Sequence, residues 1–152
     1  MVKKKDYLTL DNQLCFALYV CSKEIIRMYK PHLEPFNLTY TGYITMMALW
    51  EQDNISVKEL GKRLFLDSGT LTPLLKKLEA EGYAKRTRSE KDERTVIITL
   101  TDKGRNLKLQ CGDIPKKMTG CAKLSQETTQ ILIDELHCMM QKMQKNQQDT
   151  ET

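Results

Sequence analysis

The chain of 152 residues lacks the patterns by which many enzymes and metal proteins are recognised. It contains no Walker, G-x-G-x-x-G, G-x-S-x-G or H-E-x-x-H motif, and it has only two histidines. Its five cysteines are odd in number and no two have C-x-x-C spacing, which argues against a disulfide framework and a cysteine-rich zinc site. We therefore expect no enzyme, no cofactor and no metal.

Long hydrophobic runs are also missing. The apolar stretch at residues 44–50 is far too short to span a bilayer. The basic start of the chain is followed by acidic and amide side chains rather than by the apolar segment of a signal peptide. With 40% apolar and 29% charged residues the chain is able to form a core. We expect a cytoplasmic protein with no membrane partner.

The net charge of +4 is concentrated in the middle of the chain. Residues 56–108 hold thirteen basic and eight acidic side chains, whereas residues 1–55 are neutral and residues 109–152 carry a net charge of −1. A basic segment between neutral ends indicates a surface for a polyanion. A solvated lysine-rich surface would have the same composition, so charge alone leaves both interpretations open.

The N-terminal part of the chain has the pattern of an amphipathic helix. Apolar side chains at roughly helical spacing predict a helix over residues 11–30, capped by Asp11 or Asn12. Pro31 and Pro35 are expected to end it, because proline lacks the amide hydrogen that a helix needs.

Three further helices are predicted, over residues 39–52, 102–112 and 125–145, with a polar tail at residues 146–152. The strongly apolar centre of the first of them indicates deep burial. The N- and C-terminal helices carry more apolar surface than a small domain covers, so a second copy of the chain is the simplest partner.

The middle of the chain predicts two short helices joined by a tight turn. Ser56 and Glu59 have the spacing of a capping box, and Leu60 and Leu64 should face inward in the helix that follows. After a turn at residues 65–67, Asp67 or Ser68 caps a second helix over residues 69–81, which Gly82 ends. Its apolar stripe is Leu71, Leu74, Leu75 and Leu78. This is a helix-turn-helix pattern.

A β-hairpin is expected directly after it. Residues 83–88 and 95–100 read as strands, and the polar segment 89–94 reads as an exposed tip. We therefore predict a mainly α fold with a small β-wing, a winged helix-turn-helix. The predicted organisation is a domain over residues 8–145, with a DNA-binding lobe at 56–104 and dimerisation helices at 8–35 and 105–145.

A helix-turn-helix places its second helix in the major groove of double-stranded DNA. Ser68, Thr70 and Thr72 would then lie near base edges, and Lys76 and Lys77 near phosphates. At the wing, Arg94 would enter the minor groove, with Asp92 holding it by an ion pair while DNA is absent. The predicted phosphate contacts of the wing are Arg86, Arg88 and Lys91.

Three segments carry a resemblance to a known family. They are residues 66–79, Leu-Asp-Ser-Gly-Thr-Leu-Thr-Pro-Leu-Leu-Lys-Lys-Leu-Glu, with Asp92-Glu93-Arg94; residues 10–19, Leu-Asp-Asn-Gln-Leu-Cys-Phe-Ala-Leu-Tyr; and residues 38–43. Together they resemble the MarR family of bacterial repressors, and within it the OhrR/SarZ branch that senses organic hydroperoxides and other oxidants. The resemblance covers roughly residues 8–140.

The resemblance implies a homodimer on a palindromic operator, joined by its first and last helices. Cys15 matches the reactive cysteine of the branch, Tyr29 and Tyr40 match tyrosines that bond its sulfur from the opposite subunit, and Tyr19 matches a third tyrosine nearby. Phenolic hydroxyls directed at sulfur favour the thiolate, which is the nucleophile toward peroxide. Oxidation of Cys15 to a sulfenic acid would release the DNA.

Several alternatives stay open. Cys121 resembles a resolving cysteine that forms a disulfide with Cys15 between subunits, whereas other members cap the oxidised sulfur with a small cellular thiol as a mixed disulfide. A small aromatic ligand in the dimer cleft is the alternative signal. A metal is disfavoured because His137 and Cys138 are the only adjacent ligand pair. A thiol peroxidase based on Cys15 would leave the winged helix unexplained.

Overall fold

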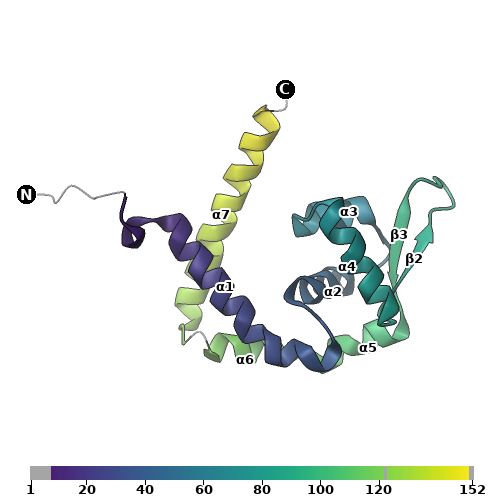
Figure 1. Cartoon of the computed structure of the whole chain (residues 1–152), viewed down its shortest axis with the longest axis horizontal. Coiled ribbons are helices and arrows are strands. Elements are labelled where there is room, and N and C mark those ends of the chain that lie inside the picture. The colour runs from purple at the N-terminus through teal and green to yellow at the C-terminus, as the bar shows by residue number, and fades with distance from the viewer. Residues whose placement is uncertain (1–7, 122, 151–152) are drawn as a thin grey trace, which may run out of the picture. The chain divides into compact units, whose positions relative to one another are not determined.

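The computed structural model describes residues 8–121 and 123–150, without the side chains of Thr119, Cys121 and residues 145–150. It forms two compact units, Met1–Pro115 and Lys116–Thr152. In the first unit a β-hairpin projects from a group of helices (Figure 1). No helix in the described part of the chain is both long and apolar enough to cross a membrane. The elements are η1 (Leu10–Asn12), α1 (Leu14–Leu33), η2 (Glu34–Phe36), α2 (Tyr40–Glu51), β1 (Ile55–Ser56), α3 (Val57–Leu64), α4 (Ser68–Ala80), β2 (Ala84–Arg88), β3 (Val96–Leu100), α5 (Asp102–Gln110), α6 (Ile114–Cys121) and α7 (Gln126–Thr150).

Helix α1 confirms the predicted N-terminal helix but begins differently. The predicted cap by Asp11 or Asn12 is wrong, because both residues lie in the 3-10 turn η1. Gln13 occupies the capping position and makes no side-chain cap hydrogen bond. The turn is closed instead by the backbone, where the Gln13 N–H donates to the Leu10 carbonyl at 3.0 Å. A turn of this kind satisfies backbone groups locally, so no side-chain cap is needed.

The predicted end of this helix is also wrong, because Pro31 lies inside α1. The helix continues to Leu33, and the Glu34 N–H still donates to the Lys30 carbonyl. A proline this close to the end removes one hydrogen bond and leaves only two residues beyond it, so the loss is small. Burial of Leu33, which is 1% exposed, compensates for it.

The two helices of the helix-turn-helix form as predicted. Ser56 Oγ accepts the Glu59 N–H at 3.1 Å and the Glu59 carboxylate accepts the Ser56 N–H at 3.3 Å, which completes the capping box of α3. Asp67, rather than Ser68, caps α4 by accepting the Thr70 N–H at 2.8 Å. Gly82 follows α4 with a φ of +76°, a conformation that glycine adopts without steric cost.

The core lies between α2, the helix-turn-helix and the sheet. Helix α2 confirms the predicted deep burial, with Met46 and Leu49 both 0% exposed. Leu60, which was predicted to face inward, is fully buried, but Leu64 is only half-buried. The stripe of α4 is buried at Leu71, Leu75 and Leu78 and half-buried at Leu74.

The wing is the antiparallel hairpin of β2 and β3, in which Ala84 pairs with Leu100 and Arg88 with Val96. This confirms both predicted strands. A third strand, β1, pairs Ile55 with Ile98 on the other edge of β3, so the sheet order is β1-β3-β2. Two residues are too few to show an alternating pattern, which is why β1 was not predicted.

The C-terminal third differs from the prediction in its boundaries. Helix α5 ends at Gln110 and α6 is a separate helix. Helix α7 continues to Thr150, beyond the predicted end near residue 145. Ser125 Oγ accepts the Thr128 N–H at 3.1 Å at its start. No described side chain of α7 is buried within this chain; Ile131 is 56% exposed and Leu132 is 46% exposed.

Candidate DNA interface and redox site

Helix α4 presents one polar face to solvent. The side chains of Ser68, Thr72 and Lys76 are exposed and recur every four residues, so they form one line along the helix. Thr70 and Lys77 are also exposed, but they lie near the opposite edge of the exposed face of the helix. All five residues predicted to contact DNA on this helix are therefore exposed, although they do not form a single line.

Thr70 is partly engaged within the protein. Its hydroxyl donates to Asp67 Oδ2 at 3.2 Å, and its N–H donates to the other oxygen of the same carboxylate. These hydrogen bonds hold the pKa of Asp67 below its ordinary value. The start of the helix is thus ordered by a charged cap before anything binds it.

The tip of the wing is ordered by Asp92. Its carboxylate accepts the Thr95 hydroxyl at 2.8 Å and the backbone N–H of Arg94 at 3.1 Å, and these bonds lower the pKa of Asp92. The predicted ion pair of Asp92 with the Arg94 side chain is wrong, since the described ion pairs do not include it. A carboxylate that satisfies two turn donors holds the loop rather than the guanidinium. The Arg94 side chain is left exposed beside Arg88 and Lys91.

Arg86 differs from the other cations of the wing. Its guanidinium lies 2.7 Å from Glu79 Oε2 and donates a second bond through Nε at 2.8 Å. The Arg86 N–H also donates to Glu79, and together these contacts lower the pKa of that carboxyl. The pair joins β2 to α4, so Arg86 positions the wing against the helix. Glu79 was not anticipated from the sequence.

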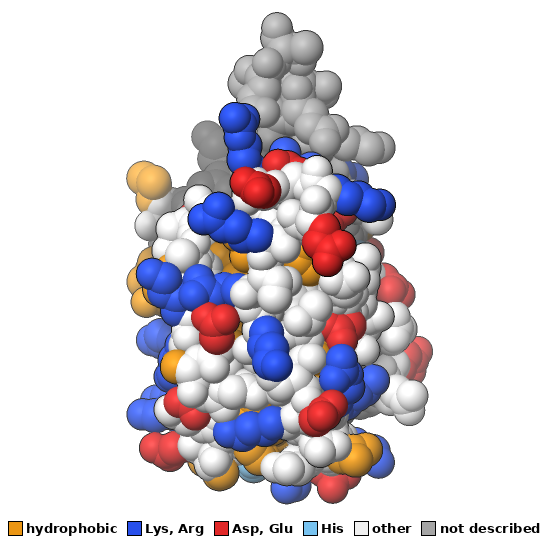
Figure 2. Space-filling view, turned by 90° about the vertical axis from the view of Figure 1, so that its right-hand side faces the viewer, with side chains coloured by type: hydrophobic (Ala, Val, Ile, Leu, Met, Phe, Trp, Pro, Cys, Tyr) orange, Lys and Arg blue, Asp and Glu red, His pale blue; other side chains and the backbone are white. Residues whose placement is uncertain are grey.

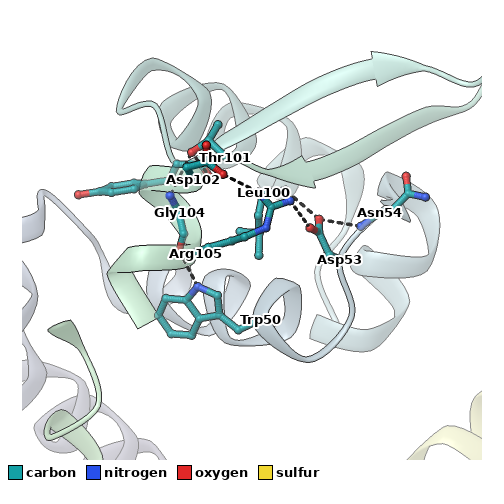
Figure 3. Close-up of polar contacts among 9 residues, drawn as sticks. Trp50, Asp53, Asn54, Leu100, Thr101, Asp102, Gly104 and Arg105 are labelled. Carbon is teal, nitrogen blue, oxygen red and sulfur yellow. Dashed lines mark hydrogen bonds and ion pairs between the residues drawn. The ribbon is translucent and has the colours of Figure 1, made fainter. Parts of the chain in front are cut away.

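The base of the wing is fastened by Asp53, which follows α2 (Figure 3). Asp53 Oδ1 accepts the backbone N–H of Leu100 at 2.8 Å, and Oδ2 lies 3.1 Å from the Arg105 guanidinium. Nearby, Trp50 Nε1 donates to the Gly104 carbonyl at 2.8 Å. These contacts join α2, β3 and α5. No sequence signal indicated them, because the partners are some fifty residues apart.

Positive charge is dispersed over this side of the molecule. Figure 2 shows lysine and arginine side chains scattered among acidic ones rather than gathered in one uniform patch. An open hollow of about 720 Å³ separates α3, α4 and the wing, with Ser68, Thr72 and Arg94 in its lining. Of the predicted DNA contacts, this hollow therefore brings together Ser68, Thr72, Arg86 and Arg94. The other predicted contacts on α4 and the wing do not line it.

Cys15 lies at the start of α1, where it is exposed in this chain. Tyr19, one turn further along, is 62% exposed, and the Lys23 ammonium lies 5.5 Å from its ring centre. Tyr29 is on the same helix, but fourteen residues correspond to about 21 Å along the axis. A single chain therefore does not bring Cys15 and Tyr29 together.

The structure does bring Tyr29 and Tyr40 together, with ring centres 4.9 Å apart. Burial and the neighbouring Tyr40 raise the pKa of Tyr29, so its hydroxyl is a proton donor at neutral pH. A third aromatic residue, Tyr43, lies 5.9 Å from Tyr29, and burial raises its pKa to about 12. Tyr43 was missed, although its spacing of three residues from Tyr40 places both on one helix face.

The other cysteines have different environments. Cys21 and Cys138 are exposed, whereas Cys111 is buried and its pKa is raised by that burial. The side chain of Cys121, the predicted resolving residue, lies outside the described residues. No group of three or more metal ligands occurs among the residues that the structure describes.

Comparison with known proteins matches residues 27–110 to the family model "Transcriptional regulator SarA/Rot". The chain is 45% identical to the organic hydroperoxide resistance transcriptional regulator of Bacillus subtilis, over 96% of this chain and all of that protein. It is 49% identical to the regulator SarZ of Staphylococcus epidermidis, over 84% of this chain and 86% of that protein.

Among solved structures, reduced AbfR bound to DNA has a TM-score of 0.74 and 36% identity, over 88% of this chain and 93% of that one. AbfR, a Staphylococcus epidermidis protein, has also been solved overoxidised on DNA and with a disulfide formed. These similarities extend over the winged lobe and the flanking helices alike. The chain belongs to the SarA/Rot family of transcriptional regulators, within the MarR-like winged-helix group that includes the organic hydroperoxide and SarZ regulators.

Proposed function

We propose that this chain is a redox-sensing, DNA-binding transcriptional repressor that acts as a cytoplasmic homodimer. The observation that carries the proposal is the exposed thiol of Cys15 on a helix that also presents Tyr29 and leads into a winged lobe. The names of the relatives, an organic hydroperoxide resistance regulator and SarZ, support it.

The DNA-binding half of the proposal rests on α4 and the wing. In a helix-turn-helix the second helix enters the major groove, and Ser68, Thr70 and Thr72 stand near its start, where base edges are reached. The exposed Lys76, Lys77, Arg88 and Lys91 are suited to phosphates, and Arg94 to a minor groove. Hydroxyl side chains discriminate weakly between bases, so we expect DNA shape to contribute to sequence preference.

The sensor half requires two copies of the chain. Because Cys15 and Tyr29 are separated along one helix, their side chains meet only when two α1 helices pack in opposite directions. Leu33 is the only residue of α1 that is buried within this chain, which leaves an apolar face for such packing. Phenolic donors from Tyr29 and Tyr40, with Tyr19 beside them, would then stabilise the Cys15 thiolate.

The chemistry follows from the thiolate. The sulfur attacks the outer oxygen of an organic hydroperoxide, an S–O bond forms, the O–O bond breaks, and the alcohol leaves with a proton from solvent. A second thiol then attacks the sulfenic sulfur and releases water. We propose Cys121 of the other copy for this step, with a small cellular thiol as the alternative. Each thiol reacts once per release of DNA, which describes a switch rather than an enzyme.

Release requires only a modest change in free energy. A loss of about 3 kcal/mol in operator binding weakens the complex by roughly two decades. Oxidation would replace the phenol–sulfur hydrogen bonds and shift the helices that carry the wings. The two α4 helices would then no longer match half-sites one helical turn apart.

The test compares reduced and peroxide-treated protein on a duplex that the reduced protein has selected from a random pool. Wild type should lose about a hundredfold in affinity on oxidation, and Cys15→Ser should lose none. Cys21→Ser is the matched control, since Cys21 is also an exposed cysteine of α1, and it should respond like wild type. A Cys15→Ser protein that still releases DNA on oxidation would exclude Cys15 as the sensor.

A second gel-based measurement separates the two fates of the oxidised sulfur. Oxidised wild type should migrate as a covalent dimer without reductant, and Cys121→Ser should migrate as a monomer. The oxidation is repeated with a small thiol present. If both proteins then migrate as monomers and mass spectrometry shows the addition of one such thiol, the mixed disulfide is the product.

A second candidate signal is an anionic small molecule. A hollow of about 380 Å³ between α1 and α4 is lined by Arg27, Lys30 and Lys77 together with Leu33 and Tyr40. One acidic residue, Glu34, also lies in the lining, so the cations leave a net positive charge beside the apolar walls, which suits an aromatic carboxylate. Release of DNA by such an acid under strong reductant, in a Cys15→Ser background, would favour this candidate over oxidation.

A further inference from the structure

The turn that ends α3 has an unusual residue at its centre. Phe65 adopts a left-handed conformation, with a φ of 56°. The Leu66 N–H donates to the Gly61 carbonyl at 3.0 Å and the Phe65 N–H to the Lys62 carbonyl at 3.4 Å. This pattern is a Schellman turn, whose central position usually holds glycine or asparagine.

Among the residues that the structure describes, two other turns have both of these hydrogen bonds and follow that rule. Gly82 (φ 76°) ends α4, where the Tyr83 N–H donates to the Leu78 carbonyl. Asn37 (φ 52°) ends η2, where the Leu38 N–H donates to the Leu33 carbonyl. Phe65 is therefore the exception among three equivalent turns, and a bulky side chain in this conformation is strained.

Packing in the core does not explain the exception. The Phe65 side chain is 57% exposed, so it recovers little of the strain by burial. The apolar contact that usually accompanies such a turn is available from the next residue, Leu66, which is half-buried. A strained residue that the fold itself does not require points to a function.

The position of Phe65 indicates which function. It lines the open hollow between α3, α4 and the wing, together with Ser68, Thr72 and Arg94, the residues proposed to contact DNA. Lys58 and Lys62 lie in the same lining. An exposed aromatic ring surrounded by cations and hydroxyls on this face would be covered when a duplex binds.

We propose that Phe65 is a DNA-reading side chain that contacts the C5-methyl group of a thymine at the edge of the half-site read by α4. This inference rests on the proposed DNA-binding function and adds a specificity-determining residue to it. An apolar side chain recognises thymine in the major groove through this methyl group, because no other standard base carries one.

The experiment uses the full chain, reduced, on the duplex selected as above, with each thymine replaced in turn by deoxyuridine, which lacks only the methyl group. Wild type should lose about fourfold in affinity at one thymine of each half-site, the value of one buried methyl group. Phe65→Gly and Phe65→Asn both keep the backbone conformation, and both should be indifferent to that replacement. Asn37→Gly, a matched change at an equivalent turn, should respond like wild type.

Three results would overturn the inference. They are that Phe65→Gly retains the uridine sensitivity of wild type, that it binds every duplex as tightly as wild type does, or that it loses affinity equally on selected and unrelated duplexes. Melting curves of the variants show that the fold is intact, since removal of strain should leave stability equal or higher. Failure of wild type to bind any duplex would instead overturn the DNA-binding proposal, and this inference with it.

Discussion

The winged lobe and the long helices α1 and α7 differ in how many of their apolar side chains one chain buries. In the lobe, α3 and α4 have side-chain caps and bury four of their six leucines, Leu60, Leu71, Leu75 and Leu78. By contrast, α1 buries only Leu33 over twenty residues, and α7 buries none of its described side chains. A helix whose apolar face stays in water is incomplete as a folded unit. The comparison teaches that one chain buries the core of the lobe by itself, whereas the long helices leave apolar faces for the association that we propose.

The largest effect on stability is expected when a leucine is replaced by alanine in the lobe, compared with the same replacement in α1. Leu71→Ala removes a side chain that is 1% exposed and should cost about 2–5 kcal/mol of stability. Leu14→Ala removes one that is 65% exposed and should cost about 0.5 kcal/mol or less in dilute protein, with a larger cost as concentration rises. Denaturant unfolding at two protein concentrations checks both. Equal costs at every concentration would contradict the comparison.

A charge on α7 tests association directly. Ile131 is 56% exposed in one chain, and Ile131→Glu should be tolerated by the lobe but disfavour burial between two copies. We expect a monomer by sedimentation and operator binding weakened about a hundredfold, because two linked half-site contacts become one. Gln141→Glu, an exposed polar position of the same helix, is the control and should remain dimeric.

A smaller effect is expected at the junction of the wing with α5. Thr101 Oγ1 accepts the Gly104 N–H at 3.0 Å and donates to the Gly82 carbonyl at 2.6 Å. Thr101→Ala should lower the stability of the lobe by about 1 kcal/mol, as loss of a helix cap does, and Thr101→Ser should restore it. Thermal melting measures the difference. No change in Thr101→Ala would show that the cap contributes nothing here.

The smallest effect is the response of the lobe to acid. The pKa values of Asp67, Glu79 and Asp92 are lowered by hydrogen bonds present only in the folded state. Their contribution is therefore complete above the unfolded values of 3.8 for aspartate and 4.5 for glutamate, and it is lost as pH falls through the lower folded values. The melting temperature should decline below about pH 4, and less steeply in Asp67→Asn and Glu79→Gln. Asp67 and Asp92 are exposed and Glu79 is only half-buried, so each slope is small.

Patterns of short range predicted most of the lobe. The capping box at Ser56, the stripe of α4 and the hairpin all depend on residues a few positions apart, and such signals survive in the sequence. The errors at Asp11 and Pro31 have the same origin, because a local rule was overridden by a 3-10 turn in one case and by burial of Leu33 in the other. The sequence placed Phe65 only within a turn. Its strain depends on a backbone angle, which the sequence does not show.

The chain's residues alone established the winged lobe, the thiol of Cys15 and the resemblance to oxidant-sensing repressors, because periodicity, caps and motifs are properties of neighbouring residues. Folding in three dimensions decided what distant residues do to one another. It paired Arg86 with Glu79, tied Asp53 to β3 and α5, and added Tyr43 to the tyrosines beside α1. No local pattern encodes such contacts, because their geometry exists only once the core has brought the elements together.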